Sequence, residues 1–345
     1  MPLASPEQYR QMLDSARRGG YALPAYNVSS LEMLTAVLEG LTDAQSDGII
    51  AISVSASRFL SGPTVNDCVL GAQTFAEFAH RVADRYPVLV ALHTDHCGAD
   101  DLDRFVVPLL AITEERRRCG LPPLFNSHMW DGSALSLQDN LDIAQPLLAR
   151  CAAVDVLLEI EVGVIGGERE GLSADHPDRL YSTPEDFLAV VDRLGAGAQG
   201  RYLVAATFGN VHGIYKPGNV KLDPQVLRRG QEVVRQRTGG KDFDLVFHGG
   251  SGSGLDSIHE AIDHGVVKMN ISTEAEYCYT RPVVDHMMRN YNGVLMIDGE
   301  VGEKKAYDPR KYLRKAQDGL SARVARSCVE LKSAGSALLI KASIE

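Results

Sequence analysis

The stretch Val88-Leu-Val-Ala-Leu-His93-Thr94-Asp95-His96-Cys97 decides the fold of this chain. Its apolar residues form a run that is too short to span a membrane and is bounded by Pro87, which is typical of a buried parallel strand. The run ends in an acid that lies between two imidazoles. It therefore predicts a core strand that carries chemistry at its C-terminal tip.

Two later segments repeat this plan. Residues 202–213 run from an apolar strand to His212, and residues 243–250 run from an apolar strand to His248. Three strands that each end in histidine can bring three imidazoles to one metal ion.

The composition is that of an ordinary globular protein. The chain has 345 residues, of which 45% are hydrophobic and 23% are charged, and we expect a single domain over residues 1–345. Its 35 Lys and Arg against 45 Asp and Glu give a net charge of -10, without a basic run. A nucleic-acid surface is therefore not indicated, although an acidic protein can still bind a small anionic substrate locally.

The cysteines and the N-terminus indicate the cellular compartment. The six cysteines are scattered without CxxC spacing, so we expect reduced thiols. The N-terminus has no apolar signal region, and no apolar run approaches the ~18 residues of a membrane span. We expect a cytoplasmic protein without a membrane partner.

Strands and helices alternate regularly along the chain. We expect strands at 23–28, 48–53, 88–97, 124–129 and 154–162 and others ending near 207, 248 and 270, with helices at 8–18, 31–44, 66–86, 141–153, 184–194, 224–237 and 255–264. About eight strand–helix units predict an α/β fold, a (β/α)8 TIM barrel, here with a C-terminal helical extension. The alternative is an open doubly wound sheet. Polar residues at the ends of many strands favour the barrel, in which all C-terminal strand ends face one mouth.

The histidines at strand ends have to be weighed against a simple structural role. Each of His93, His96, His128, His212 and His248 alone is better explained as a satisfied buried histidine. Together they favour a catalytic Zn²⁺ site with three imidazole ligands and one open position. The residues alone leave open whether His93 or His96 is a ligand.

Two glycine- or serine-containing loops are candidates for phosphate binding. Residues 249–254, Gly-Gly-Ser-Gly-Ser-Gly, follow a strand and precede a helix, so their amides can form an anion site, although a plain flexible turn is the simpler reading. The segment from Asn270 to Thr273 follows the last strand, where barrels commonly bind phosphate. The loop at residues 163–171 carries carboxylates towards the mouth, or is a solvated surface loop.

These segments carry a family resemblance. The motifs are Leu92-His-Thr-Asp-His-Cys97, Phe125-Asn-Ser-His-Met-Trp-Asp-Gly-Ser133, Thr207-Phe-Gly-Asn-Val-His-Gly-Ile-Tyr-Lys-Pro-Gly218, Phe247-His-Gly-Gly-Ser-Gly-Ser253 and Val267-Lys-Met-Asn-Ile271. Together they resemble the zinc-dependent class II fructose-bisphosphate aldolases over nearly the whole chain. The segment from Asp298 to Arg310 resembles the longer, dimeric subgroup of that family.

The resemblance implies roles for individual residues. His96, His212 and His248 would bind Zn²⁺, and Asp95 would move a proton on the aldehyde-derived oxygen. Asn270 would take part in catalysis and in binding. The dihydroxyacetone phosphate half would be bound by Gly213, Lys216, Gly249, Ser251, Asn270, Ser272 and Thr273, some of which would also bind a monovalent cation, Na⁺ or K⁺.

The resemblance also implies a homodimer and a mechanism. Ser53, together with Arg310 from the partner subunit, would bind the distal phosphate. The zinc ion would polarise the ketone carbonyl and stabilise an ene-diolate, which then attacks an aldehyde.

Three positions depart from the family pattern. Arg169 replaces the glutamate that abstracts a carbon-bound proton, and a guanidinium cannot act as a base at neutral pH. Glu168 or Glu170 would then take that role. The pair Ser55-Ala56 replaces two glycines, and the segment from Asn270 to Glu274 has a serine, Ser272, where the family has an aspartate.

Three functions are compatible with these observations. The first is reversible cleavage of fructose 1,6-bisphosphate to dihydroxyacetone phosphate and glyceraldehyde 3-phosphate, as in glycolysis. The second is a paralogous aldolase that uses dihydroxyacetone phosphate with a different aldehyde in a specialised pathway, with Arg169 facing an anionic group of that aldehyde. The third is an inactive protein that binds a phosphosugar, which the intact Asp95 and histidines disfavour.

Overall fold

The structure is a computed structural model that describes residues 3–163, 166–167, 180–212, 222–250, 252–295 and 302–342. For residues 166–167 and 211–212 only the backbone is described.

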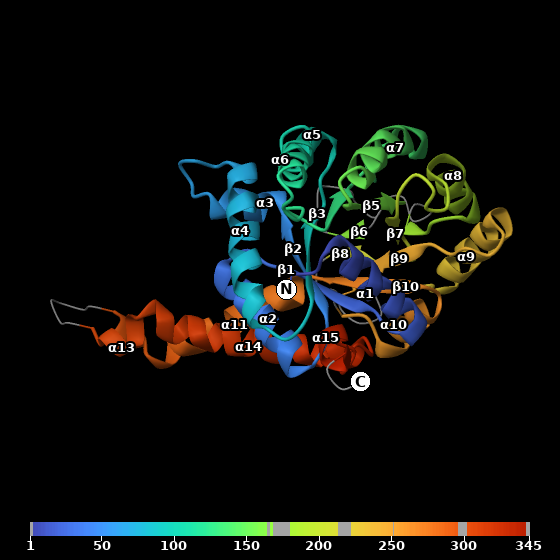
Figure 1. Ribbon diagram of the computed structural model, residues 1–345. Helices are drawn as coiled ribbons and strands as arrows, with labels where there is room; N and C mark the ends of the chain where they lie inside the picture. Colours follow the sequence, from blue (N-terminus) through green and yellow to red (C-terminus); the bar gives the residue numbers. More distant parts are fainter. Residues whose placement is uncertain are drawn as a thin grey trace.

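Eight parallel strands close into a barrel, which confirms the predicted fold and excludes the open sheet (Figure 1). They follow one another around the barrel in the order β1-β10-β9-β7-β5-β4-β3-β2. These strands are β1 (Leu23–Asn27), β2 (Gly48–Ser53), β3 (Val90–Asp95), β4 (Ser127–Trp130), β5 (Leu157–Val162), β7 (Tyr202–Ala206), β9 (Asp244–Phe247) and β10 (Val266–Ile271). A separate short pair is formed by β6 (Gly166–Gly167) and β8 (Val211–His212).

Helices surround the strands. They are α2 (Leu31–Asp43), α3 (Val54–Leu60), α4 (Cys68–Val82), α5 (Ala99–Leu102), α6 (Val106–Arg118), α7 (Leu137–Ala152), α8 (Pro184–Leu194), α9 (Gln225–Thr238) and α10 (Leu255–Asp263), with the 3-10 turn η1 (Ala83–Arg85). The C-terminal helices are α11 (Thr273–Arg289), α12 (Tyr291–Val294), α13 (Lys304–Tyr307), α14 (Pro309–Glu330) and α15 (Leu338–Ala342). The outer parts of α11 and α14, with α13, form an arm that projects away from the barrel, which confirms the predicted helical extension (Figure 1).

The first helix, α1 (Pro6–Gly19), closes the N-terminal end of the barrel. Ser5 caps it by accepting a hydrogen bond from the Gln8 amide, and Pro6 occupies its first turn. Its apolar face, which includes Met12 and Leu13, packs against residues that the strands point inwards. Apolar side chains therefore fill this end of the barrel, and a functional site can form only at the opposite end.

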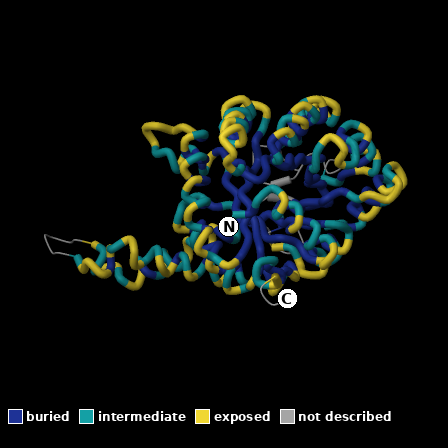
Figure 2. The backbone as a smooth tube through the Cα atoms, in the orientation of Figure 1, coloured by how far each residue is buried: buried dark blue, intermediate teal, exposed yellow. Residues whose placement is uncertain are grey.

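The alternation of side chains along each strand decides what faces the barrel interior. On β3, Ala91 belongs to the inner cluster, whereas Val90 and Leu92 pack outwards against the helices. His93 and Asp95 continue the inward series, with Asp95 at the mouth and His93 one layer below. Buried positions appear dark blue throughout the strands (Figure 2).

Some predicted elements differ in their ends or orientation. The strand expected at 88–97 is only Val90–Asp95, and the helix expected at 141–153 begins at Leu137, because the Ser136 hydroxyl caps it four residues earlier than expected. His128 faces outwards and contacts the Thr94 hydroxyl, so it does not belong to the mouth. Thr94 and His128 are buried polar residues on the outer side of the strands, and this hydrogen bond gives each side chain a partner.

Candidate active site

The carboxylate of Asp95 lies at the centre of the mouth and is held by two amides. Asn27, the last residue of β1, donates to one oxygen at 2.6 Å, and Asn270 of β10 donates to the other at 3.0 Å. Asp95 is only 1% exposed. Three strands therefore fix a buried carboxylate in one orientation.

His96 joins Asp95 because the backbone turns sharply after β3. His96 has a φ of 23°, a region that side-chain-bearing residues rarely adopt and that is often strained at functional sites. Its Nδ1 lies 2.8 Å from the carboxylate of Asp131, which follows β4, and its Nε2 lies 4.0 Å from Asp95. The hydrogen bond to Asp131 fixes the ring so that Nε2 faces Asp95.

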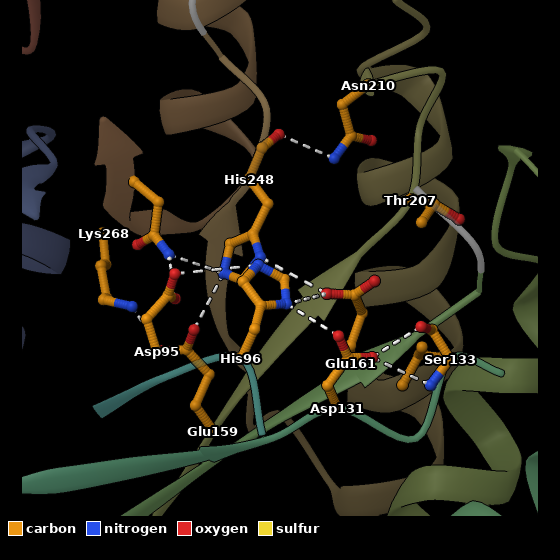
Figure 3. A network of polar contacts seen from close by, with 12 residues as sticks. Asp95, His96, Asp131, Ser133, Glu159, Glu161, Thr207, Asn210, His248 and Lys268 are labelled. Carbon is orange, nitrogen blue, oxygen red and sulfur yellow. Dashed lines mark hydrogen bonds and ion pairs between the residues drawn. The ribbon is translucent and has the colours of Figure 1, made fainter. Parts of the chain in front are cut away.

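His248 follows β9 and completes the described group. Its ring lies edge-on to that of His96, with 4.9 Å between centroids (Figure 3). The Nε2 atom lies 2.9 Å from Glu159, and Nδ1 lies 3.4 Å from Glu161. Gly249 then adopts a φ of 63°, a conformation that favours glycine at this turn.

Carboxylates dominate the electrostatics around these two rings. Burial would raise the pKa of Glu159, but the Lys268 ammonium together with the imidazoles of His93 and His248 outweighs burial and holds this pKa well below its usual range. Burial, together with the nearby Asp131 charge, raises the pKa of Glu161. Despite burial, Glu159 and Glu161 raise the pKa of His248 to about 9. The site therefore stabilises positive charge strongly.

The described donor atoms fit a metal ion. Ligand atoms of Asp95, His96 and His248 lie within 4.8 Å of one another, and so do those of His96, Asp131 and Glu161. The buried Nδ1 of His248 has no hydrogen-bond partner among the described residues. A buried imidazole nitrogen without a hydrogen bond, close to carboxylates, is the environment that a divalent cation would satisfy.

A cavity of about 590 Å³ opens above this group. Its described lining contains no lysine or arginine. The lining residues are Asn27, Val28, Ser29, Met33, Ser53, Ser55, Ala56, Phe59, Asp95, His96, His248, Gly249, Asn270, Ser272, Thr273 and Glu276. None of the described residues that line the cavity therefore offers a cationic side chain to a phosphate.

The structure brings many of the predicted site residues together. Asp95, His96, His248, Ser53, Gly249, Asn270, Ser272 and Thr273 all line this cavity. His93, the alternative ligand, is fully buried one layer deeper and contacts Ser127 at 2.8 Å. Six predicted residues lie outside the described part of the chain, namely Glu168, Arg169, Glu170, Gly213, Lys216 and Ser251, and so does the side chain of His212.

Arg310 is not part of the cavity of its own chain. It lies at the start of α14, its side chain is 84% exposed, and it pairs with Asp308. That contact lowers the pKa of Asp308 to about 2, through the hydrogen bond from Arg310.

Five residues of the site were not predicted as site residues. They are Asn27, Asp131, Glu159, Glu161 and Lys268. The alternation on β5 could have identified two of them, because Leu157 faces inwards and residues 159 and 161 share its face. Lys268 is harder to predict, because the register of β10 shifts between Val266 and Lys268.

The fold and the site together define a barrel enzyme with a candidate metal centre at the C-terminal ends of its strands. The sequence profile described as fructose-bisphosphate aldolase class-II matches residues 7–336. The chain is 55% identical to fructose-bisphosphate aldolase of Corynebacterium glutamicum over 97% of this chain and 98% of that protein. It is 53% identical to the enzyme of Mycobacterium tuberculosis, over 98% and 99% of the two chains.

A solved structure agrees with these sequence comparisons. The fructose-bisphosphate aldolase of Campylobacter jejuni superposes with a TM-score of 0.84 at 34% identity, and the match covers 96% of each chain. The chain belongs to the class II fructose-bisphosphate aldolase family. It is an aldolase, a carbon–carbon lyase that acts on a phosphorylated sugar, from a metal-dependent family. No described helix is long and apolar enough to cross a membrane.

Proposed function

We propose that this protein cleaves fructose 1,6-bisphosphate reversibly to dihydroxyacetone phosphate and glyceraldehyde 3-phosphate, as a glycolytic enzyme of the cytoplasm. The observation that carries this proposal is the Asp95 carboxylate, which Asn27 and Asn270 hold beside His96 and His248 at the barrel mouth. Relatives at 53–55% identity bear the name of this activity.

We assign the metal ion as zinc, held by His96, His212 and His248. Imidazole nitrogens are preferred zinc ligands, and three of them leave one position for substrate. The hydrogen bonds from His96 to Asp131 and from His248 to Glu159 orient the rings as in other histidine–metal sites. When bound, zinc supplies Lewis-acid polarisation of the ketone carbonyl.

The chain's own residues do the rest of the work. Asp95 gives and takes the proton of the hydroxyl at which the carbon–carbon bond breaks, since its carboxylate is fixed and faces the cavity. Glu168 or Glu170 moves the proton on carbon. Asn270 orients Asp95 and contacts the substrate. The donor phosphate half is bound by Gly213, Lys216, Gly249, Ser251, Ser272 and Thr273, with a monovalent cation alongside.

A homodimer completes the site in this proposal. The described lining has no cationic side chain. Arg310 lies at the start of α14, next to α13, and this arm projects away from its own barrel (Figure 1). The arm also exposes large apolar side chains that a partner would cover, including Val284 and Met288. We infer that Arg310 of a second copy binds the distal phosphate together with Ser53.

A second candidate function is condensation of dihydroxyacetone phosphate with a different aldehyde. Ser55, which stands where the family has glycine, lines the cavity, and its hydroxyl lies 3.0 Å from that of Ser53. Ser55 therefore changes the part of the cavity lining that we expect to face the aldehyde. Arg169 on the undescribed loop would bind an acidic group of such an aldehyde, as a guanidinium pairs with carboxylate.

The two candidates are separated by turnover of the wild type and of Arg169→Glu on two substrates. The glycolytic function predicts efficient cleavage of fructose 1,6-bisphosphate by the wild type, undiminished relative to the variant. The altered acceptor predicts slow cleavage that rises in Arg169→Glu by roughly 10²–10⁴-fold, with loss of condensation to an acidic aldehyde. A wild type that turns over neither substrate contradicts both.

A further inference from the structure

A fully buried ion pair lies directly below the candidate metal centre (Figure 3). Lys268 and Glu159 are both 0% exposed, and the Lys268 Nζ lies 2.6 Å from Glu159 Oε2. Isolated charges in a protein interior are costly, and replacing a buried pair by apolar residues is often neutral or stabilising. Stability alone is therefore a poor explanation for this pair.

The two oxygens of Glu159 have different partners. Oε2 accepts from Lys268, and Oε1 lies 2.9 Å from His248 Nε2. His248 is one of the three proposed metal ligands. The lysine thus sets the orientation in which the carboxylate meets the ring.

This contact determines which nitrogen of His248 faces the metal centre. An imidazole that binds a metal ion is neutral and carries one proton, and a carboxylate on Nε2 places that proton there. The unprotonated Nδ1 is then the ligand atom, and it is the buried nitrogen without a hydrogen bond. The Asn270 amide nitrogen, 3.1 Å from Nε2, cannot donate to a protonated nitrogen, so in this tautomer that contact is not a hydrogen bond.

We propose that Glu159 and Lys268 are positioning residues for the metal centre. Glu159 accepts the hydrogen bond of His248 Nε2–H and so presents Nδ1 to the metal, and Lys268 holds Glu159 in place. This inference rests on the proposed function, because it requires His248 to be a metal ligand. Carboxylates that orient a ligating histidine commonly change metal affinity by about 10–100-fold when they are removed.

Two double variants isolate the hydrogen bond from the charges. Glu159→Leu/Lys268→Met removes both charges and the acceptor, whereas Glu159→Gln/Lys268→Met removes both charges but keeps an amide oxygen that can accept from Nε2–H. Zinc affinity is measured by chelator competition on the full-length protein. The visible absorption of the cobalt-substituted protein reports the ligand geometry independently of activity.

We expect the Leu variant to bind zinc about 10–100-fold more weakly than the wild type, with an altered cobalt spectrum. The Gln variant should recover most of the affinity and the wild-type spectrum. Ser127→Ala is the matched control, since Ser127 contacts His93 in the same buried layer but not Glu159, and it should bind zinc normally. Melting of each metal-free protein monitors folding.

A further variant covers the case in which the Leu protein does not fold. Glu159→Asp keeps the charge opposite Lys268 but shortens the side chain by one methylene, so it should also weaken zinc binding and shift the cobalt spectrum. Wild-type affinity and spectrum in Glu159→Asp and in every folded double variant overturn this inference alone. Absence of zinc binding by the wild type overturns the proposed function and this inference with it.

Discussion

Asp95 is the residue on which the proposed chemistry depends. Replacing it by asparagine preserves the size of the side chain but removes the proton acceptor, so we expect turnover to fall by roughly 10²–10⁴-fold. Affinity for dihydroxyacetone phosphate should change little, because the phosphate contacts are elsewhere. Steady-state cleavage kinetics and calorimetric binding measure the two effects separately.

Thr94→Val is the control for Asp95→Asn. Thr94 precedes Asp95 on β3 but faces outwards, where its hydroxyl contacts His128. This variant should melt at a lower temperature, since it leaves a buried imidazole nitrogen unpaired, while its turnover stays close to that of the wild type. Unchanged turnover in Asp95→Asn would show that Asp95 is not the proton-transfer group.

His212 is the proposed ligand whose side chain lies outside the described residues. His212→Ala removes one of three ligands, so we expect the purified variant to lose bound zinc and activity while its circular dichroism remains that of a folded barrel. Elemental analysis gives the zinc content. A stoichiometric zinc ion in this variant is the result that refutes the ligand assignment.

The sequence predicted the site residues at strand ends better than the residues that hydrogen-bond to them and fix their orientation. The resemblance selected His96 over His93, and the structure places His96 at the mouth and His93 below it. Asp131 and Lys268 could not be found in the same way. Their roles depend on a turn with positive φ at His96 and on a register shift in β10, and neither follows from side-chain alternation.

Asp47 connects three elements at the closed end of the barrel. Its carboxylate accepts from the amide of Leu89, just before β3, at 2.8 Å and from the amide of Leu338, at the start of α15, at 2.9 Å. Burial raises the pKa of Asp47 to about 6, although both hydrogen bonds oppose this shift. We therefore expect the contribution of Asp47 to the free energy of unfolding to depend on pH.

The sign of this dependence follows from proton binding. Between the unfolded pKa near 3.8 and the folded value of about 6, the folded state binds more protons than the unfolded state. The free energy of unfolding should therefore fall by about 2 kcal/mol as pH rises from 4 to 6, and it should become level only above about pH 7.

Asp47→Asn tests this contribution, because asparagine does not titrate. Urea unfolding of both proteins from pH 4 to pH 7 gives the difference in free energy of unfolding. We expect the stability of the wild type relative to the variant to decline through this range. A difference that is independent of pH would mean that Asp47 titrates alike in both states.

Element boundaries were predictable where local signals were strong. Thr183 and Pro184 mark the start of α8, and β2 is the predicted Gly48–Ser53. The short helix α3 was not predicted, because its seven residues follow β2 directly and offer too little apolar periodicity. The long arm helices were predicted only as a C-terminal helical extension, without bounds. Their exposed apolar face has no partner within the described chain.

The proposed role of Arg310, which lies on the arm, can be tested only in the assembled dimer. Arg310→Ala should raise the KM for fructose 1,6-bisphosphate with a smaller effect on dihydroxyacetone phosphate, because only the distal phosphate loses a bidentate partner. Arg310→Lys should restore little, since an ammonium cannot reproduce the planar fork. Mixing Arg310→Ala with the inactive Asp95→Asn should regain activity in hybrid dimers. A monomer by light scattering at assay concentration would contradict the shared site.

The most direct test of the account is the rate of fructose 1,6-bisphosphate cleavage by the metal-free protein before and after one equivalent of zinc is added. We expect negligible cleavage after chelation and recovery of activity that saturates near one zinc ion per chain. Full activity in the chelated protein, with zinc absent by elemental analysis, would contradict the proposal that His96, His212 and His248 hold a zinc ion that the reaction requires.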